Sequence, residues 1–577
     1  MKIIVFTTLG LLIGALVSGR VRPVLAFMGA LGVFVALGLI ELESALANVI
    51  NPSLVTLVLL ILISLALQKT PFVSGLGDRL LRGSYGRGVC QLFGVVCSAS
   101  AVVNNTAVVA SLISTISRNR QFVASRVLLP LSYASIFGGG LTLIGSSTNM
   151  IVNSLAIQEG FGALGFFTIT PLGLVMVSVG CLMTALLGYR FLPERKMADR
   201  DLQNYFVEAR VADDSPLIGK SIMENGLRHL GRLFLVEVVR NGELISPVAP
   251  CERLRDGDVL VFSGDVSAVP LLQKFPGLKL FHGSHESDSD PLLNNLAEAY
   301  ISHQSVLVGK TVREINFRTQ FDAAVVAIRR GNERLEGSLG NITLRTGDSL
   351  VLAVGEDFSQ HTNLERNFYL INGIEVEHAL SPIQSVLVLA GFLLTLGLSV
   401  SGVLPLMEGL VFLLGGLIVT KVLTLEEIRR RFPFEMLAIV AATLGIAQVI
   451  ITTGVAGSIA GAINSVFGQW GVYGALIGVY LLALLFTEVI NNNAAAALVF
   501  PIAMEMANRW EAEPLPFIIA LIFGASASFI SPFGYQTNLM VYSAGNYRVQ
   551  DFVRVGLPLS VVYSVCVLAL IPLFFPF

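Results

Sequence analysis

Residues 487–494 have the sequence TEVINNNA and lie at the centre of an apolar stretch, 474–507. Residues 100–107, with the sequence SAVVNNTA, occupy the same place in the apolar stretch 88–117, 387 positions earlier. Polar, non-helical backbone at membrane depth is stable only where protein or a water-filled cavity satisfies its hydrogen bonds. We therefore predict that each stretch forms a re-entrant hairpin buried in protein.

A second pair of polar motifs has nearly the same separation. GSSTN at 145–149 and GYQTN at 534–538 lie 389 positions apart, each in an apolar segment that follows a hairpin. Two polar motifs that recur at almost one offset are more specific than either motif alone. The pattern predicts that the membrane part consists of two repeats.

The overall composition is that of a polytopic membrane protein. Apolar residues make up 54% of the 577 residues, charged residues make up 14%, and the mean hydropathy is +0.74. Soluble proteins carry about 25% charged residues. The net charge of −2 offers no basic surface for nucleic acid.

The charged residues are concentrated in one interval. Residues 191–380 hold 47 of the 78 charged residues and all six histidines. This distribution predicts a soluble insert between two membrane segments. It also leaves no histidine for a proton relay within the membrane.

Apolar windows long enough to cross a bilayer of about 30 Å occur five times on each side of the insert. They lie near 3–19, 23–41, 53–68, 127–157 and 168–193, and near 382–401, 406–422, 434–451, 516–546 and 555–576. The first window has no cleavage site after it, so we predict a span and not a signal peptide. Five spans, an odd number, place the second half upside down relative to the first, as in secondary transporters built from inverted repeats.

Lysine and arginine collect in cytoplasmic loops. Nearly all loop arginines and lysines share one side if the first span runs from outside to inside. We therefore expect a multi-pass plasma membrane (cell inner membrane) protein with both termini outside and a cytoplasmic insert.

The insert itself is duplicated. SPLIGKS at 215–221 matches SVLVGKT at 305–311, and LRDGD at 254–258 matches LRTGD at 344–348, both at an offset of 90. Alternating apolar runs predict strands in each unit. The predicted fold is a polytopic α-helical membrane protein with inverted repeats of five spans plus a re-entrant hairpin each, and a cytoplasmic α+β insert of two tandem modules. The predicted domains are a first membrane repeat at 1–193, modules at 200–285 and 286–375, and a second membrane repeat at 381–577.

The four polar motifs combine helix starts with oxygen donors. Asparagine, serine and threonine before an alanine-rich run are preferred helix N-caps, and a helix N-terminus suits an anion. Carbonyls and hydroxyls at the same breaks suit a small hard cation such as sodium. None of the motifs contains lysine or arginine, so bound cations must compensate a buried dianion. The alternative is that these amides and hydroxyls only hold helices together.

Glu488 is an ionisable residue at membrane depth. Such a residue is a candidate for function. The alternative is a carboxyl group that faces a water-filled outer vestibule.

Residues 1–193 and 381–577 resemble the divalent anion/sodium symporter (DASS) family on the two hairpin motifs and the two motifs that follow them. The insert resembles two consecutive TrkA-C (RCK-C) domains, and the combination is similar to a branch of the family associated with sulfate uptake. The resemblance implies a homodimer in the membrane lipid, with a scaffold domain and a moving transport domain that work as an elevator. The family often has Pro-Pro where this chain has Ser147-Thr148 and Gln536-Thr537, which argues against its usual C4-dicarboxylate specificity.

The resemblance also implies the site residues. One sodium ion would be bound by Ser100, Asn104, Asn105 and the Gly145 carbonyl, and another by Thr487, Asn491, Asn492 and the Gly534 carbonyl. The anion would contact Asn105, Thr106, Asn492 and Asn493 from the hairpins, and Ser146, Ser147, Tyr535 and Gln536 from the broken spans.

The first hypothesis is therefore sodium-coupled uptake of sulfate, and the second is a sodium/dicarboxylate symporter for malate or succinate. A gated ion channel is suggested only by the TrkA-C pair, and the chain has no TVGYG filter. Nothing favours an enzyme. The insert lacks a GxGxxG strand-helix unit, so NAD is not expected. We expect it to regulate transport in response to a cytosolic small molecule, or only to stabilise the dimer.

Overall fold

The computed structural model describes residues 1–18, 21, 23–50, 52–70, 84–117, 122–195 and 380–577, together with most of 206–281 and 296–372. Five helical segments of this part are long and apolar enough to cross a membrane, and shorter apolar helices accompany them. The five are Thr170–Phe191, Pro382–Val400, Phe434–Thr452, Val455–Val489 and Val549–Phe574. The prediction of a polytopic helical membrane protein is confirmed.

The first half of the chain forms helices that break at the predicted polar motifs. The stretch 88–117 contains α6 and α7, which meet at a non-helical tip. The predicted span 127–157 contains α8 and α9, separated by 140–146. The elements are α1 (Lys2–Ser18), α2 (Pro23–Ala36), α3 (Leu42–Ala47), η1 (Asn48–Ile50), α4 (Pro52–Gln68), α6 (Tyr85–Ser100), α7 (Asn105–Ser117), α8 (Ala124–Gly139), α9 (Ser147–Gln158) and α10 (Thr170–Phe191).

The second half breaks at the corresponding motifs. Its hairpin stretch contains α20 and α21, and its last broken span contains α22 and α23. The elements are α15 (Pro382–Val400), α16 (Leu406–Val419), α17 (Leu425–Arg431), α18 (Phe434–Thr452), α19 (Val455–Phe467), η6 (Gly468–Trp470), α20 (Gly471–Val489), α21 (Asn492–Arg509), α22 (Pro514–Ser526), α23 (Gln536–Ala544) and α24 (Val549–Phe574).

One helix of this half, α19, was not predicted. Gly454, with φ +70°, separates it from α18. With 13 residues it is too short to cross a bilayer alone, which takes about 20 residues. The apolar segment Val455–Val489 contains it together with α20. α19 packs against α20 and α21, the two limbs of the hairpin.

The insert forms two antiparallel sheets with equivalent strand orders. The first contains β1 (Phe206–Val211), β2 (His229–Leu230), β3 (Leu233–Arg240), β4 (Glu243–Ile245), β5 (Val259–Gly264) and β6 (Leu278–Phe281), in the order β2-β3-β5-β1-β6 with β4 beside β3. The second contains β7 (Leu296–Ile301), β8 (Ala323–Arg330), β9 (Glu333–Arg334), β10 (Ser349–Val354) and β11 (Phe368–Asn372), in the order β11-β7-β10-β8-β9. Short helices α12 (Val312–Ile315), α13 (Phe317–Phe321) and α14 (Leu364–Asn367) and the turn η4 (Leu339–Asn341) complete the second sheet's unit. We call the unit of β1–β6 module 1 and that of β7–β11 module 2; the predicted junctions at 200, 285 and 375 lie outside the described residues.

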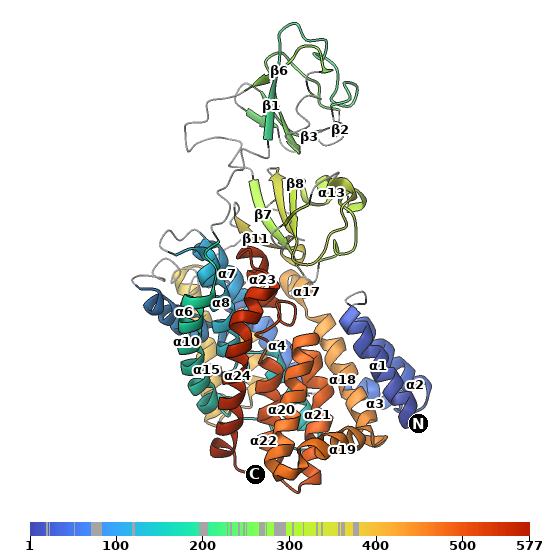
Figure 1. The fold of residues 1–577 in the computed structure, drawn as a ribbon, viewed down its shortest axis with the longest axis vertical. Helices are drawn as coiled ribbons and strands as arrows, with labels where there is room; N and C mark the ends of the chain where they lie inside the picture. The colour runs from blue at the N-terminus through green and yellow to red at the C-terminus, as the bar shows by residue number, and fades with distance from the viewer. Residues whose placement is uncertain are drawn as a thin grey trace.

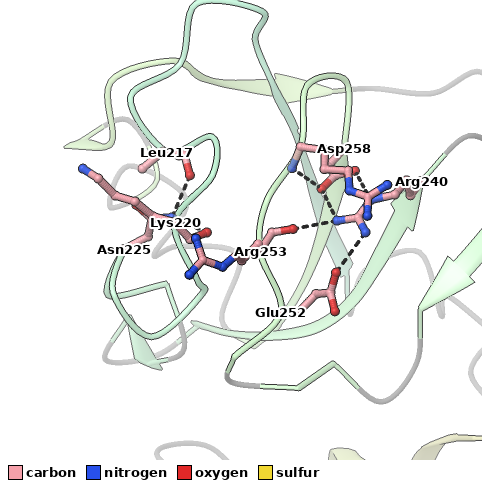
Figure 2. Close-up of polar contacts among 8 residues, drawn as sticks. Leu217, Lys220, Asn225, Arg240, Glu252, Arg253 and Asp258 are labelled. Carbon is pink, nitrogen blue, oxygen red and sulfur yellow. Dashed lines mark hydrogen bonds and ion pairs between the residues drawn. The ribbon is translucent and has the colours of Figure 1, made fainter.

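In each module, an arginine side chain hydrogen-bonds the aspartate of the Gly-Asp turn. In module 1, Arg240 donates from Nε and Nη2 to the two carboxylate oxygens of Asp258, both at 2.9 Å, and from Nη1 to Glu252 (Figure 2). The hydrogen bonds to buried Asp258 raise the pKa of Arg240 above its ordinary value. In module 2, Arg330 binds Asp348 in the same way at 2.8 Å. The Gly-Asp motifs are therefore structural turns.

Module 2 lies between the helical part and module 1, and both chain ends lie toward the opposite end of the helical part (Figure 1). The apolar core is continuous through the helical part, and each module has a core of its own. The insert therefore stands at one end of the helix bundle, beyond α7 and α23.

Candidate functional site

The four polar motifs each start a helix. α7 begins at Asn105, α9 at Ser147, α21 at Asn492 and α23 at Gln536. The residues just before them act as caps where their side chains allow it: Oδ1 of Asn104 accepts the Thr106 amide at 2.9 Å, Oδ1 of Asn491 accepts the Ala494 amide at 2.9 Å, and Oγ of Ser146 accepts the Thr148 amide at 3.3 Å. These local bonds explain why the chain restarts as helix at these positions.

The tip of the first hairpin contacts the broken span of the second half. Nδ2 of Asn105 donates to the Tyr535 hydroxyl at 2.6 Å. The Thr106 hydroxyl donates to Oε1 of Gln536 at 3.1 Å. The structure thus brings together two pairs of residues that are 430 positions apart in the chain. All four residues were predicted to bind the anion.

The tip of the second hairpin contacts the broken span of the first half in the same manner. Oδ1 of Asn493 accepts hydrogen bonds from the hydroxyls of Ser147 at 3.1 Å and Thr148 at 3.0 Å. Each hairpin is therefore bonded to the half of the chain to which it does not belong. The side chain of Tyr535, which precedes α23, also hydrogen-bonds that of Ser146, which precedes α9. The four helix N-termini that the sequence proposed for the site therefore lie in one region.

Oxygen atoms gather at the first break between α8 and α9. Oγ of Ser100 and Oδ1 of Asn105 are buried and have no hydrogen-bond partner. A Cβ atom placed on Gly145 would lie 3.0 Å from the Ser100 carbonyl oxygen and 2.8 Å from that of Gly139. A buried acceptor without a partner costs about 1–3 kcal/mol. A cluster of oxygens of this kind suits a hard cation.

A second oxygen cluster lies at the corresponding break. The Thr487 hydroxyl is 2.7 Å from Oδ1 of Asn492, and a Cβ on Gly534 would lie 2.7 Å from the Thr487 carbonyl oxygen. The same Cβ would clash with Oγ of Ser528, which is buried without a partner, as is Oγ of Ser526. Sequence reasoning missed both serines; the signal was the alternating Ala-Ser run that interrupts an apolar segment at 525–528.

Asn104 and Asn491 do not join these clusters. Both are exposed, and the carboxamide oxygen of each already accepts a backbone N–H as a helix cap. The structure therefore separates them from Asn105 and Asn492, with which the sequence analysis grouped them as sodium ligands. Both side chains therefore serve as helix caps and belong to neither oxygen cluster.

Equivalent asparagines hydrogen-bond the backbone carbonyls at both breaks. Nδ2 of Asn149 donates to the carbonyls of Gly139 and Thr142 at 2.9 and 3.0 Å. Nδ2 of Asn538 donates to those of Ser528 and Ser531, each 389 positions later, at 2.8 and 3.2 Å. These bonds satisfy carbonyls that leave the helix ladder in an apolar environment, where an unsatisfied group is costly.

Glu488 hydrogen-bonds the non-helical segment between α22 and α23. Its carboxylate accepts three successive backbone amides, those of Phe529 at 3.0 Å, Ile530 at 2.9 Å and Ser531 at 2.8 Å. The first half has Ala101 at the corresponding place, and there the Thr142 hydroxyl donates to the Ala101 carbonyl instead. Glu488 therefore shapes the second break, a role that neither interpretation of the sequence foresaw.

We predict that Glu488→Gln destabilises the fold. The amide group would face the Ser531 N–H, and losing a hydrogen bond to a charged group costs about 1.5–3 kcal/mol. Thermal unfolding in detergent should show this loss, while Glu513→Gln, at an exposed position whose side chain makes no cap hydrogen bond, should not. Equal melting temperatures in Glu488→Gln and Glu513→Gln would contradict this structural role.

The family model described as citrate transporter matches residues 12–514. The chain belongs to the citrate transporter family. This citrate transporter family protein is a membrane transporter and not an enzyme.

Named relatives of this family member cover different shares of the chain. A putative sulfur deprivation response regulator of Chlamydomonas reinhardtii is 32% identical over 93% of this chain and 96% of its own length. An uncharacterized transporter of Synechocystis is 28% identical over 94% of this chain and 92% of its own length. Sodium/sulfate cotransporter 1 of Chlamydomonas reinhardtii is 32% identical over 63% of this chain, and the match spans 42% of that protein.

Proposed function

We propose that the protein is a sodium-coupled symporter that imports a divalent anion, and that the anion is sulfate. The observation that carries the proposal is the pair of oxygen clusters, with unpartnered buried oxygens of Ser100, Asn105 and Ser528, beside four converging helix N-termini. Relatives named sodium/sulfate cotransporters support the choice of both ions.

The sodium ions occupy the two oxygen clusters. The first is formed by Ser100, Asn105 and the carbonyls of Gly139 and Gly145, and the second by Thr487, Asn492, Ser528 and the Gly534 carbonyl. Ser528 stands 389 positions after Gly139, so its hydroxyl supplies an oxygen in the second cluster where the first has only backbone. Such oxygen ligands match the preference of hard cations.

The anion lies between the clusters, at the helix N-termini. Its contacts are the amides, hydroxyls and backbone N–H groups of the two hairpin tips and the two broken spans: Asn105, Thr106, Ser146, Ser147, Asn492, Asn493, Tyr535 and Gln536. The helix dipoles favour negative charge there. Because none of these residues is basic, sodium binding must precede or accompany the anion, which couples the two movements.

Transport proceeds by alternating access between two inverted repeats, with an elevator movement of the site helices against a scaffold in a homodimer. The protein lies in the plasma membrane. Its insert is a cytoplasmic pair of TrkA-C-type modules that regulates the elevator movement. A gated channel is disfavoured because the hairpin tips are bonded across the site, as at Asn493 and Ser147, and a continuous ion path would break these bonds.

Uptake into proteoliposomes tests the proposal directly. We expect labelled sulfate to accumulate only with an inward sodium gradient, and unlabelled succinate to compete no better than chloride. The hydroxyl and amide donors at Ser147 and Gln536 surround a compact anion whose whole surface is oxygen. If succinate were transported faster than sulfate, the substrate would be a dicarboxylate and not sulfate. If sulfate uptake did not depend on the sodium gradient, the proposed coupling to sodium would be wrong.

A further inference from the structure

Module 2 contacts two of the helices that begin at the candidate site. α7 and α23 start at Asn105 and Gln536 and lie at the insert end of the helical part (Figure 1). β11 packs against α7, and the turn before β10 lies on α23. The module therefore touches one site helix from each half of the chain.

The contact on α23 is close. The Ser543 hydroxyl donates to the Gly347 carbonyl at 2.7 Å. A Cβ on Gly347 would lie 3.3 Å from Cδ1 of Leu539, so the backbone of the turn rests on the helix. Tyr300, only 6% exposed, belongs to the apolar core of the helical part although it lies on β7.

This contact continues to the candidate site. Tyr300, Gly347 and Met540 line a small gap together with Gln536. Gln536 also accepts the hydrogen bond of Thr106 at the hairpin tip. One side chain thus links the docked module to the place where we put the anion.

The described residues of module 1 lack this surface, although the module shares the strand order. Arg210 stands 90 positions before Tyr300 and is exposed, and Asp256 stands 90 positions before Thr346. A Cβ on Gly257, the counterpart of Gly347, would meet no atom within 4 Å. The docking face is therefore a feature of module 2 and not of the repeated fold.

The module is also tied to a different set of helices. β11 ends at Asn372, eight positions before Leu380. The Leu380 amide donates to the carbonyl of Lys69, which directly follows α4. From there α15 packs against α16 and α4. Eight residues reach at most about 26–29 Å. Docked module 2 thus joins the site helices to α4 and α15 through a short connection.

We propose that module 2 is a releasable clamp on α7 and α23, and that the site helices move fully only when it undocks. The inference rests on the transport function proposed above. Among the described residues, the contact on α23 consists of a small apolar patch and the Ser543 hydrogen bond. Because this contact is small, a ligand that binds the released module only modestly more tightly than the docked one shifts the equilibrium between the two states.

Substitutions on both sides of the contact test the clamp. Tyr300→Arg with Thr346→Asp installs the residues that module 1 carries at these positions, so the module's fold tolerates them. Ser543→Asp, made separately, places a carboxylate against the Gly347 carbonyl. Loss of a hydrogen bond shifts docking about fivefold, and we expect a similar rise in the initial rate of sodium-dependent uptake, with faster hydrogen exchange at 539–543.

The matched control is the reverse exchange in module 1, Arg210→Tyr with Asp256→Thr, which should change neither the rate nor the exchange. Uptake rates that are unchanged or lower in both docking variants would overturn the clamp. A wild-type protein that takes up no anion with sodium would contradict the transport proposal instead, and hydrogen exchange would still report whether the module undocks.

Discussion

Asn105→Ala and Asn492→Ala should each abolish sodium-dependent sulfate uptake while leaving the protein folded. Asn105 carries a buried carboxamide oxygen without a partner, and its Nδ2 donates to the Tyr535 hydroxyl. Asn492 lies within hydrogen-bond distance of Thr487 in the second cluster. Two lost contacts to charged groups amount to about 3–6 kcal/mol, which is at least about a hundredfold in uptake at limiting sodium. Initial rates in proteoliposomes measure the loss.

The neighbouring asparagines provide the matched control. Asn104→Ala and Asn491→Ala remove the same chemical group one position earlier, but those side chains only cap helices. Losing a cap costs about 1 kcal/mol of stability, and the sodium concentration for half-maximal uptake should not move. If Asn104→Ala weakened sodium binding as much as Asn105→Ala, the assignment of the two residues would have to be exchanged.

The sequence predicted where the chain breaks because polar residues in an apolar stretch are conspicuous. TEVINNNA and SAVVNNTA marked the hairpin tips, and helix-capping preference predicted that helices restart there. The structure has α7 and α21 beginning within these motifs. Local chemistry decides such features, and local chemistry is what a single sequence carries.

The sequence could not say which polar groups meet. Asn493 accepts the hydroxyl of Ser147, 346 positions away, and no spacing rule relates them. Similarly, Glu488 stood out as a charge in an apolar segment, but its three partners are backbone amides 41 to 43 residues later. Backbone donors leave no signature in side-chain identity, so the role of this carboxylate emerged only from the fold.

Capping and metal binding also compete for the same side chains. Asn104 and Asn105 have identical chemistry, and the sequence grouped both as sodium ligands. Helix geometry separates them, because the cap residue turns its oxygen toward the backbone of its own first turn, while the next residue points into the protein. Asn491 and Asn492 divide in the same way.

Gly145→Ala and Gly534→Ala should each weaken sodium binding by about 5–150-fold, since overpacking a closely packed site costs about 1–3 kcal/mol. The added methyl group would lie 3.0 Å from the Ser100 carbonyl in the first cluster and 2.7 Å from the Thr487 carbonyl in the second. Both atoms are backbone oxygens, which cannot rotate away. The methyl group would therefore push the proposed ligands apart without removing any of them. The sodium dependence of uptake measures the effect, and so does the rise in melting temperature that sodium produces in the wild type.

Gly94→Ala separates this steric effect from the general effect of the substitution. Gly94 lies on α6, near the first cluster in sequence, and a Cβ there would meet no atom within 4 Å. Alanine is the better helix former by about 1 kcal/mol, so this variant should melt no lower than the wild type and keep its response to sodium. Because the melting measurement needs no transport, it tests the clusters even if the carried anion is not sulfate. A full sodium-dependent rise in melting temperature in both Gly145→Ala and Gly534→Ala would place the cations elsewhere, since a weaker sodium affinity must reduce this rise at a given sodium concentration.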